Sequence, residues 1–254
     1  VQLYMQDNNI GRTGETALLS MRSRNLVEKK RIDNKLNLNE QRLDNKDLAS
    51  LAQFEKLDGV VSLTLRNNHF DYHGIQELAN SPYLKNLMSL NLMSNAVGDK
   101  GLLLLAESPN FSQLESLNLE NTGITALGIL ALSQSPHLTK LKELNLNSND
   151  LGEKGFRILA DSKNFKNLIK LRTSGVPVGD AGFQAIVQSN TLKQLEELEA
   201  MGNVITRESL DSLANSSILS QLKKLDLRRN KLKDVDLIFL ADSPQFQSLE
   251  ALRF

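Results

Sequence analysis

Histidine is the side chain most often used for metal binding or acid–base chemistry near neutral pH. The chain has three histidines, His69, His73 and His137, of which His69 and His73 are four residues apart. These two fall in a segment predicted to be a loop, and no second class of metal ligand stands near them at a matching spacing. We therefore expect solvated loop histidines and no metal site.

Glycine-rich loops are a second source of chemistry, because their backbone can bind phosphate. Gly98 and Gly101 flank Asp-Lys, and Gly152 and Gly155 flank Glu-Lys, but neither pair belongs to a P-loop or a dinucleotide-binding motif. The chain also lacks a zincin motif, and it has no cysteine to form a disulfide, a zinc site or a thiol nucleophile. We predict that it is not an enzyme and has no catalytic residue, cofactor or metal.

Charge and hydropathy restrict the class of partner. The 30 basic and 30 acidic residues give a net charge of zero, so no long-range field steers the chain to nucleic acid or to an acidic membrane. The longest apolar run, Leu102 to Ala106, is far shorter than the ~20 residues that span a bilayer. We expect no nucleic-acid partner and no membrane anchor.

Cysteine usage also bears on location. The absence of cysteine favours a reducing, cytoplasmic environment. Glycosylation sequons at Asn110 and Asn215 would also be compatible with secretion, but such short matches often arise by chance. We expect a cytoplasmic protein.

The elements that position the side chains repeat every 27 residues. An apolar or small residue stands two places after each marker leucine, and this alternation predicts a short strand with one buried face. The marker leucines are Leu36, Leu63, Leu90, Leu117, Leu144, Leu171, Leu198, Leu225 and Leu252.

Polar residues follow the marker leucines by five places in most repeats. An asparagine there can pair with backbone groups that the turn after the strand leaves free. The residues at this position are Gln41, Asn68, Asn95, Thr122, Asn149, Val176, Asn203 and Asn230.

The second half of each unit predicts a helix of about two turns with one apolar face. A glycine precedes apolar residues at helical spacing, and a serine, often with proline, follows them. The glycines are Gly74, Gly101, Gly128, Gly155 and Gly182, and the serine-proline pairs begin at Ser81, Ser108, Ser135 and Ser243.

The stretch LMSLNLMSNAVGDKGLLLLAESPNF, which begins at Leu87, resembles the leucine-rich repeat of the ribonuclease-inhibitor-like class. The resemblance covers nearly the whole chain. It implies an α/β horseshoe solenoid of about 9–10 repeats, with a parallel sheet on the concave face and helices on the convex face. The chain is also similar to repeat proteins of intracellular bacteria, some of which are effectors delivered into host cells.

The pattern begins before the first regular marker. Leu3, Met5 and Asn8 resemble an earlier strand, but Leu3 precedes Leu36 by 33 residues, so six residues are inserted. The insertion falls in the basic segment 20–31, which we interpret as a lengthened outer helix or loop rather than a docking site. We expect a single domain over residues 1–254 and, because neither end shows a polar cap, a fragment of a longer protein.

In this class of repeat the outward-pointing strand residues line the concave surface. The central column changes from neutral to charged along the arc, and the columns beside it repeat the division. Residues of the charged half can pair across neighbouring strands, or they can form a partner-binding patch. The proposed patch consists of Lys170, Arg172, Glu197, Glu199, Met201, Lys224, Asp226, Arg228 and Arg229.

The favoured hypothesis is a scaffold that binds a protein partner on its concave face, in the host cytosol if the protein is a secreted effector. An open, polar surface does not suit a small-molecule substrate. The main alternative is the substrate-recognition arm of a modifying enzyme, such as a ubiquitin ligase, with its catalytic part elsewhere. A horseshoe-type GTPase-activating protein would need an arginine or asparagine beside a nucleotide, and Arg66 is the candidate.

Overall fold

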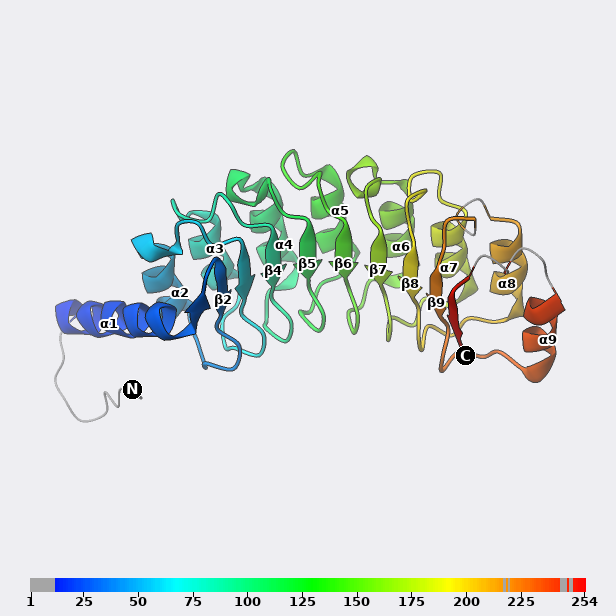
Figure 1. Cartoon of the computed structure of the whole chain (residues 1–254), viewed down its shortest axis with the longest axis horizontal. Coiled ribbons are helices and arrows are strands. Elements are labelled where there is room, and N and C mark those ends of the chain that lie inside the picture. Colours follow the sequence, from blue (N-terminus) through cyan, green and yellow to red (C-terminus); the bar gives the residue numbers. More distant parts are fainter. Residues whose placement is uncertain (1–11, 217, 219, 243–245, 247–248) are drawn as a thin grey trace.

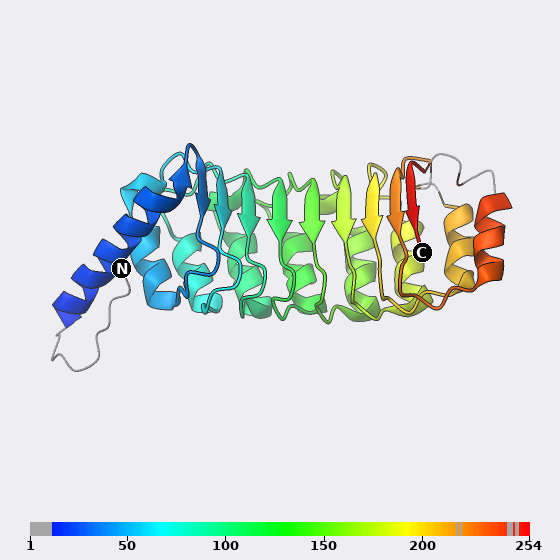
Figure 2. The same ribbon diagram turned by 60° about the horizontal axis from the view of Figure 1, so that its bottom comes forward.

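The computed structural model describes residues 12–216, 218, 220–242, 246 and 249–254. Strands form one face of a curved stack and helices form the other (Figure 1). The row of helices extends over a longer arc than the row of strands, so the sheet lines the inside of the curve (Figure 2). This arrangement confirms the predicted solenoid.

The ten strands of the sheet follow one another in chain order. From β2 onward the neighbours are parallel and pair marker leucine with marker leucine, as in Leu36 opposite Leu63, whereas β1 is antiparallel to β2. The strands are β1 Arg31–Ile32, β2 Lys35–Asn37, β3 Ser62–Thr64, β4 Ser89–Asn91, β5 Ser116–Asn118, β6 Glu143–Asn145, β7 Lys170–Arg172, β8 Glu197–Glu199, β9 Lys224–Asp226 and β10 Ala251–Arg253.

Each strand from β2 to β9 is followed by a helix that packs against its neighbours in sequence. The α-helices are α1 Arg12–Lys30, α2 Asn45–Ala52, α3 Tyr72–Ala79, α4 Gly98–Glu107, α5 Ala126–Gln134, α6 Gly152–Asp161, α7 Gly179–Val187, α8 Arg207–Ala214 and α9 Asp234–Asp242. Short 3-10 turns lie at η1 Glu55–Leu57, η2 Pro109–Phe111 and η3 Lys163–Phe165.

Leucines fill the interior between the two layers. The marker leucines from Leu36 to Leu225 are at most 1% exposed, and they join the apolar helix residues in one continuous core. The helix glycines permit this packing: a Cβ on Gly74 would lie 2.7 Å from Leu48 Cδ1 of the preceding repeat, and one on Gly128 would lie 2.6 Å from Asp99 Oδ1. Close approach of successive repeats therefore explains the predicted glycine position.

Buried asparagines join successive turns on one edge of the sheet. Asn149 Nδ2 donates to the carbonyls of Leu119 (2.8 Å) and Leu146 (3.0 Å), and its Oδ1 accepts from the backbone N–H groups of Thr122 and Ile124. The same donor pattern recurs at Asn68, Asn95 and Asn230. The predicted role of this amide is confirmed.

Serines join successive repeats at the other edge. Ser81 Oγ donates to Ala52 O over 2.6 Å, and Ser108 Oγ donates to Ala79 O over 2.7 Å. Ser135 and Ser189 make the equivalent bond to the preceding repeat. Since Ser189 has no proline after it, the recurring requirement is the hydroxyl, and the helix-stopping proline is an addition.

The basic segment 20–31 belongs mainly to α1, which is one continuous helix of 19 residues. Arg22 binds the Asp47 carboxylate of α2, and Val27 enters the core. The predicted lengthened helix is confirmed, and the antiparallel strand β1 that follows it was not predicted. The predicted strand around Leu3 and Met5 lies outside the described residues.

Replacing Asn149 with alanine is expected to lower the free energy of unfolding by about 2–4 kcal/mol, because two carbonyls and two N–H groups lose their partner in the interior. Urea denaturation at pH 7 measures the change. Asn190→Ala, at an exposed position, serves as the control and should stay within about 0.5 kcal/mol. Equal effects of the two substitutions on the free energy of unfolding would contradict the proposed role of the buried Asn149 amide.

Candidate functional site

The sheet register aligns the outward-pointing side chains in columns, as predicted. In the central column Asn145 lies opposite Asn118 on one side and Arg172 on the other. The full column is Asn37, Thr64, Asn91, Asn118, Asn145, Arg172, Glu199, Asp226 and Arg253. The change from amides to charges therefore occurs between β6 and β7.

The asparagine side chains in the first half of the central column have a fixed orientation. The Oδ1 atom of Asn91 accepts from Met93 N (3.0 Å), and that of Asn118 accepts from Glu120 N (3.0 Å). Asn145 repeats this turn and donates from Nδ2 to Glu120 Oε2 over 3.0 Å. The carboxamides of Asn91 and Asn118 consequently keep their NH2 groups for other acceptors at the surface.

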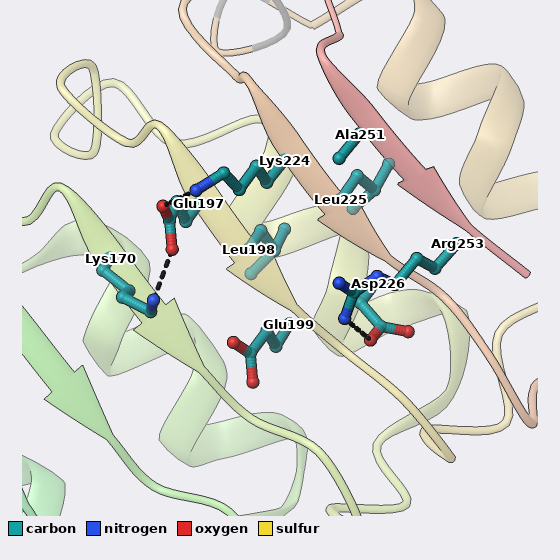
Figure 3. A pocket seen from close by; sticks show the side chains of 9 residues that line it. All are labelled: Lys170, Glu197, Leu198, Glu199, Lys224, Leu225, Asp226, Ala251 and Arg253. Atoms are coloured by element: carbon teal, nitrogen blue, oxygen red, sulfur yellow. Dashed lines mark hydrogen bonds and ion pairs between the residues drawn. The ribbon is translucent and has the colours of Figure 1, made fainter.

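Ion pairs dominate the second half. Glu197 lies between Lys170 of β7 and Lys224 of β9, and it accepts from Lys224 Nζ over 2.6 Å (Figure 3). In the neighbouring column, Arg172 Nε donates to Glu199 Oε1 over 2.9 Å. The cross-strand pairing hypothesis is therefore confirmed for these five residues.

The two ammonium groups shift the protonation of Glu197. Hydrogen bonds from Lys170 and then Lys224 lower the pKa of the Glu197 carboxyl from 4.5 to about 2. The same contact raises the pKa of Lys224, because its charged form is the one that donates to Glu197. Glu197 is therefore a fixed negative charge between two fixed positive charges at all physiological pH values.

Asp226 pairs mainly within its own repeat. It is 7% exposed, and its carboxylate accepts from Arg228 Nε (2.9 Å) and Nη2 (2.6 Å). The hydrogen bond from Arg228 lowers the pKa of Asp226. The predicted pairing across neighbouring strands occurs for Asp226 only as a weaker contact with Arg253 of β10 at 4.0 Å, because its neighbour on β8, Glu199, carries the same charge.

A small hollow of about 190 Å³ opens beside these pairs. Ala251 occupies the column in which the preceding strands carry Lys224 and Glu197, so a long side chain is missing there (Figure 3). The lining residues are Lys170, Glu197, Leu198, Glu199, Lys224, Leu225, Asp226, Ala251 and Arg253. Five of the nine patch residues predicted from sequence, namely Lys170, Glu197, Glu199, Lys224 and Asp226, line one concave feature.

The methionines and glycines beside the patch have positions set by the repeat. Met93 and Met201 are half-buried. Gly175 and Gly202 both have φ of +69°, at the turn position where every described repeat has positive φ. Glycine is the least strained residue there, so these two positions follow the scaffold rule.

One departure from the repeat pattern does have a structural cost. Val176 occupies the position at which the other repeats have a polar side chain, and it is 1% exposed. The amide of the next repeat, Asn203, accepts from Val176 N, yet its Nδ2 is the one buried side-chain N or O atom among the described residues without a hydrogen-bond partner.

Residues considered for other chemistry have structural roles or exposed positions. His73 contacts Asp71 (3.0 Å) and stacks on Tyr72, while Arg66 pairs with Glu40. No group of three or more potential metal-binding side chains occurs in the described part of the chain. Within the same part, the helices are too short or too polar to span a bilayer.

One cationic loop was predicted only in part, since the predicted patch includes Arg228 and Arg229 but not the lysines that follow them. The loop after β9 contains Arg228, Arg229, Lys231 and Lys233, all of which are exposed. The signal that could have identified it is the run RRNKLK, in which four of six residues are cations.

A family model described as Leucine Rich repeat matches residues 83–106, 137–157 and 220–241. These segments recur in the frame of the observed strands and helices. The chain contains leucine-rich repeats and folds as a leucine-rich-repeat solenoid. No curated protein sequence matches it.

Solved structures of bacterial leucine-rich-repeat proteins share the fold. An internalin from Listeria monocytogenes is 21% identical with a TM-score of 0.57, and the match covers 82% of this chain and 51% of that one. A leucine-rich-repeat protein from Leptospira interrogans is 18% identical with a TM-score of 0.51, and the match covers 91% of this chain and 56% of that one. This chain thus spans about half the length of each structure.

Glu197→Gln is expected to destabilise the fold by about 1–2 kcal/mol at pH 7, because two cross-strand ion pairs are lost. A carboxyl with a lowered pKa contributes stability above its unfolded pKa of 4.5 and loses that contribution as the pH falls toward 2. The difference between wild type and variant should therefore shrink from about pH 5 downward. Urea denaturation across this range checks it, and a difference independent of pH would contradict the assigned pKa.

Proposed function

We propose that this leucine-rich-repeat protein is an interaction scaffold that binds a protein partner on the concave sheet face. The observation that carries the proposal is the set of polar side chains that projects from every parallel strand away from the leucine core. Among the described residues no other element covers this face (Figure 2).

The charged half of the face is preorganised for recognition. Lys170, Glu197 and Lys224 hold one another in place, and so do Arg172 and Glu199. A partner with complementary charges would meet side chains that have already lost much of their freedom, which reduces the entropic cost of association. The proposed contact residues are the nine of the sequence-derived patch, with the hollow beside Ala251 receiving a partner side chain.

The strands alone are slightly small for a stable complex. A sheet of this length offers roughly 600 Å², whereas a typical interface covers about 800 Å² on each partner. The partner is therefore expected to contact the loops at the strand ends as well, near His69, Asp150 or Lys231.

The scaffold is proposed to work in a reducing cytoplasm, and in the host cytosol if it is a bacterial effector. The absence of cysteine and the likeness to solved structures of bacterial repeat proteins support this placement. A role as the substrate-recognition arm of a modifying enzyme would use the same face.

Charge reversal at Glu197 and Glu199 to lysine should abolish capture of the partner from cell lysate, because five unpaired cations would replace two ion-paired networks. Quantitative mass spectrometry of the captured proteins measures the effect. The matched control reverses Glu153 and Glu208, which are exposed on the helical face and give the same change in net charge. Capture that is equal for both variants and wild type would refute the concave face as the binding surface.

A further inference from the structure

A cluster of cations lies at the rim of the concave face, at the end of β9. It consists of Arg228, Arg229, Lys231 and Lys233 in the loop after the strand and Arg253 on β10, and we name it the β9 basic cluster. All five side chains are exposed. In a chain with zero net charge, this is a strong local excess of positive charge.

The members of the cluster differ from the cations of the neighbouring strands in their pairing. Lys170, Arg172 and Lys224 each hold a carboxylate. In contrast, within the described residues Arg229, Lys231 and Lys233 form no ion pair. Their charges remain available to a partner.

Arg228 and Arg253 share one carboxylate. Arg228 is hydrogen-bonded to Asp226, and the Arg253 guanidinium lies 4.0 Å from the same group with its side chain 65% exposed. Asp226 therefore orients Arg228 and leaves Arg253 largely unsatisfied beside the hollow (Figure 3). Both guanidinium groups retain N–H donors for a second carboxylate.

The backbone at Arg229 shows that this side chain is not required by the turn. Its φ is +57°, in the left-handed region, where the equivalent residues of the two preceding repeats are Gly175 and Gly202. Across the described repeats the other equivalents are Glu40, Asn67, Ser94, Asn121 and Ser148, so Arg229 is the one cation at this position. An arginine here costs conformational free energy that glycine avoids, and no side-chain hydrogen bond or ion pair with another described residue offsets the cost.

Arginine and lysine side chains without internal counter-ions recognise carboxylates, and arginine does so with two parallel hydrogen bonds. Four carboxylates, Asp226, Asp234, Asp236 and Glu250, lie within a few residues of the cluster cations in the sequence, and Asp226 contacts two of these cations. These carboxylates would repel the continuous phosphate track of a nucleic acid, so a short ligand with only a few negative charges fits better.

We propose that the β9 basic cluster binds a short acidic segment of the protein partner. This inference rests on the proposed function and specifies the chemistry of one end of the interface. Arg229, Lys231 and Lys233 supply the unpaired charges, and Arg228 and Arg253 supply guanidinium groups that share the Asp226 carboxylate. The acidic segment extends from the loop after β9 toward the hollow at Ala251.

The test uses a fluorescein-labelled octapeptide of alternating glutamate and serine, with the glutamine-serine octapeptide as the uncharged probe. Fluorescence anisotropy at low ionic strength measures the dissociation constant with the whole chain. Each cation removed should weaken binding of the acidic peptide about twofold to fivefold. The two variants are Arg229→Gly, and Lys231→Ser combined with Lys233→Ser.

Arg229→Gly separates binding from folding. Its thermal midpoint should equal or exceed that of wild type, because glycine suits the turn, while its affinity for the acidic peptide falls. The matched control combines Lys154→Ser with Lys163→Ser, two exposed lysines on the far side of the molecule, and should retain wild-type affinity.

Three results would overturn the proposal: unchanged peptide affinity in both cluster variants, equal binding of the glutamine-serine peptide, or equally tight, cluster-dependent binding of an oligothymidylate. The last result would identify a general polyanion site. If reversal of Glu197 and Glu199 abolishes partner capture but the cluster variants do not reduce it, binding on the concave face is supported and binding of an acidic segment by the cluster is refuted. If the cluster variants weaken both peptide binding and partner capture, and reversal of Glu197 and Glu199 changes neither, the acidic-segment site is supported and binding on the concave face is refuted.

Discussion

Burial of a hydrogen-bonding side chain in the turn after the strand, an asparagine amide in most repeats, is the interaction on which this solenoid depends. A strand that ends and turns inward leaves carbonyl and N–H groups that water cannot reach, and each unpaired group would cost about 1–3 kcal/mol. The amide of one repeat satisfies groups of its own turn and of the preceding repeat, as Asn149 does for Leu146 in its own turn and for Leu119 and Ile124 in the preceding repeat. Neighbouring repeats are thereby held at a fixed spacing and register.

Fixed register has a direct consequence for the inner surface. Because leucine lies opposite leucine from β2 to β10, every outward-pointing side chain lies beside the equivalent side chain of the next repeat. Charges of opposite sign in one column then meet at ion-pair distance, which places Glu197 between two lysines. The surface chemistry at the charged end is therefore a product of the same spacing that builds the core.

Sequence periodicity predicted the fold well because burial imposes it in every repeat. The marker leucines, the turn asparagines and the helix glycines each have a requirement that recurs every 27 residues. Strand β1 follows no such period, and it depends on a local turn at Asp33, so it was not predicted.

The candidate site was predicted in part. Column membership follows from the register, but the choice of Arg228 as the partner of Asp226 depends on side-chain conformations within one repeat. The burial of Met201 and the role of glycine at Gly175 and Gly202 depend on turn geometry that the strand pattern does not contain. Individual contacts at an open surface are less constrained than those in a core, and sequence alone specifies them less completely.

The most direct test of the account is side-chain footprinting of the chain with and without its captured partner. Oxidative and carboxyl labelling should decrease on binding at Met201 and Glu199, with little change at Leu103 and Leu127, which are exposed on the helical side. Protection confined to those helical leucines, with unchanged labelling of Met201 and Glu199, would contradict a scaffold that binds through its concave face.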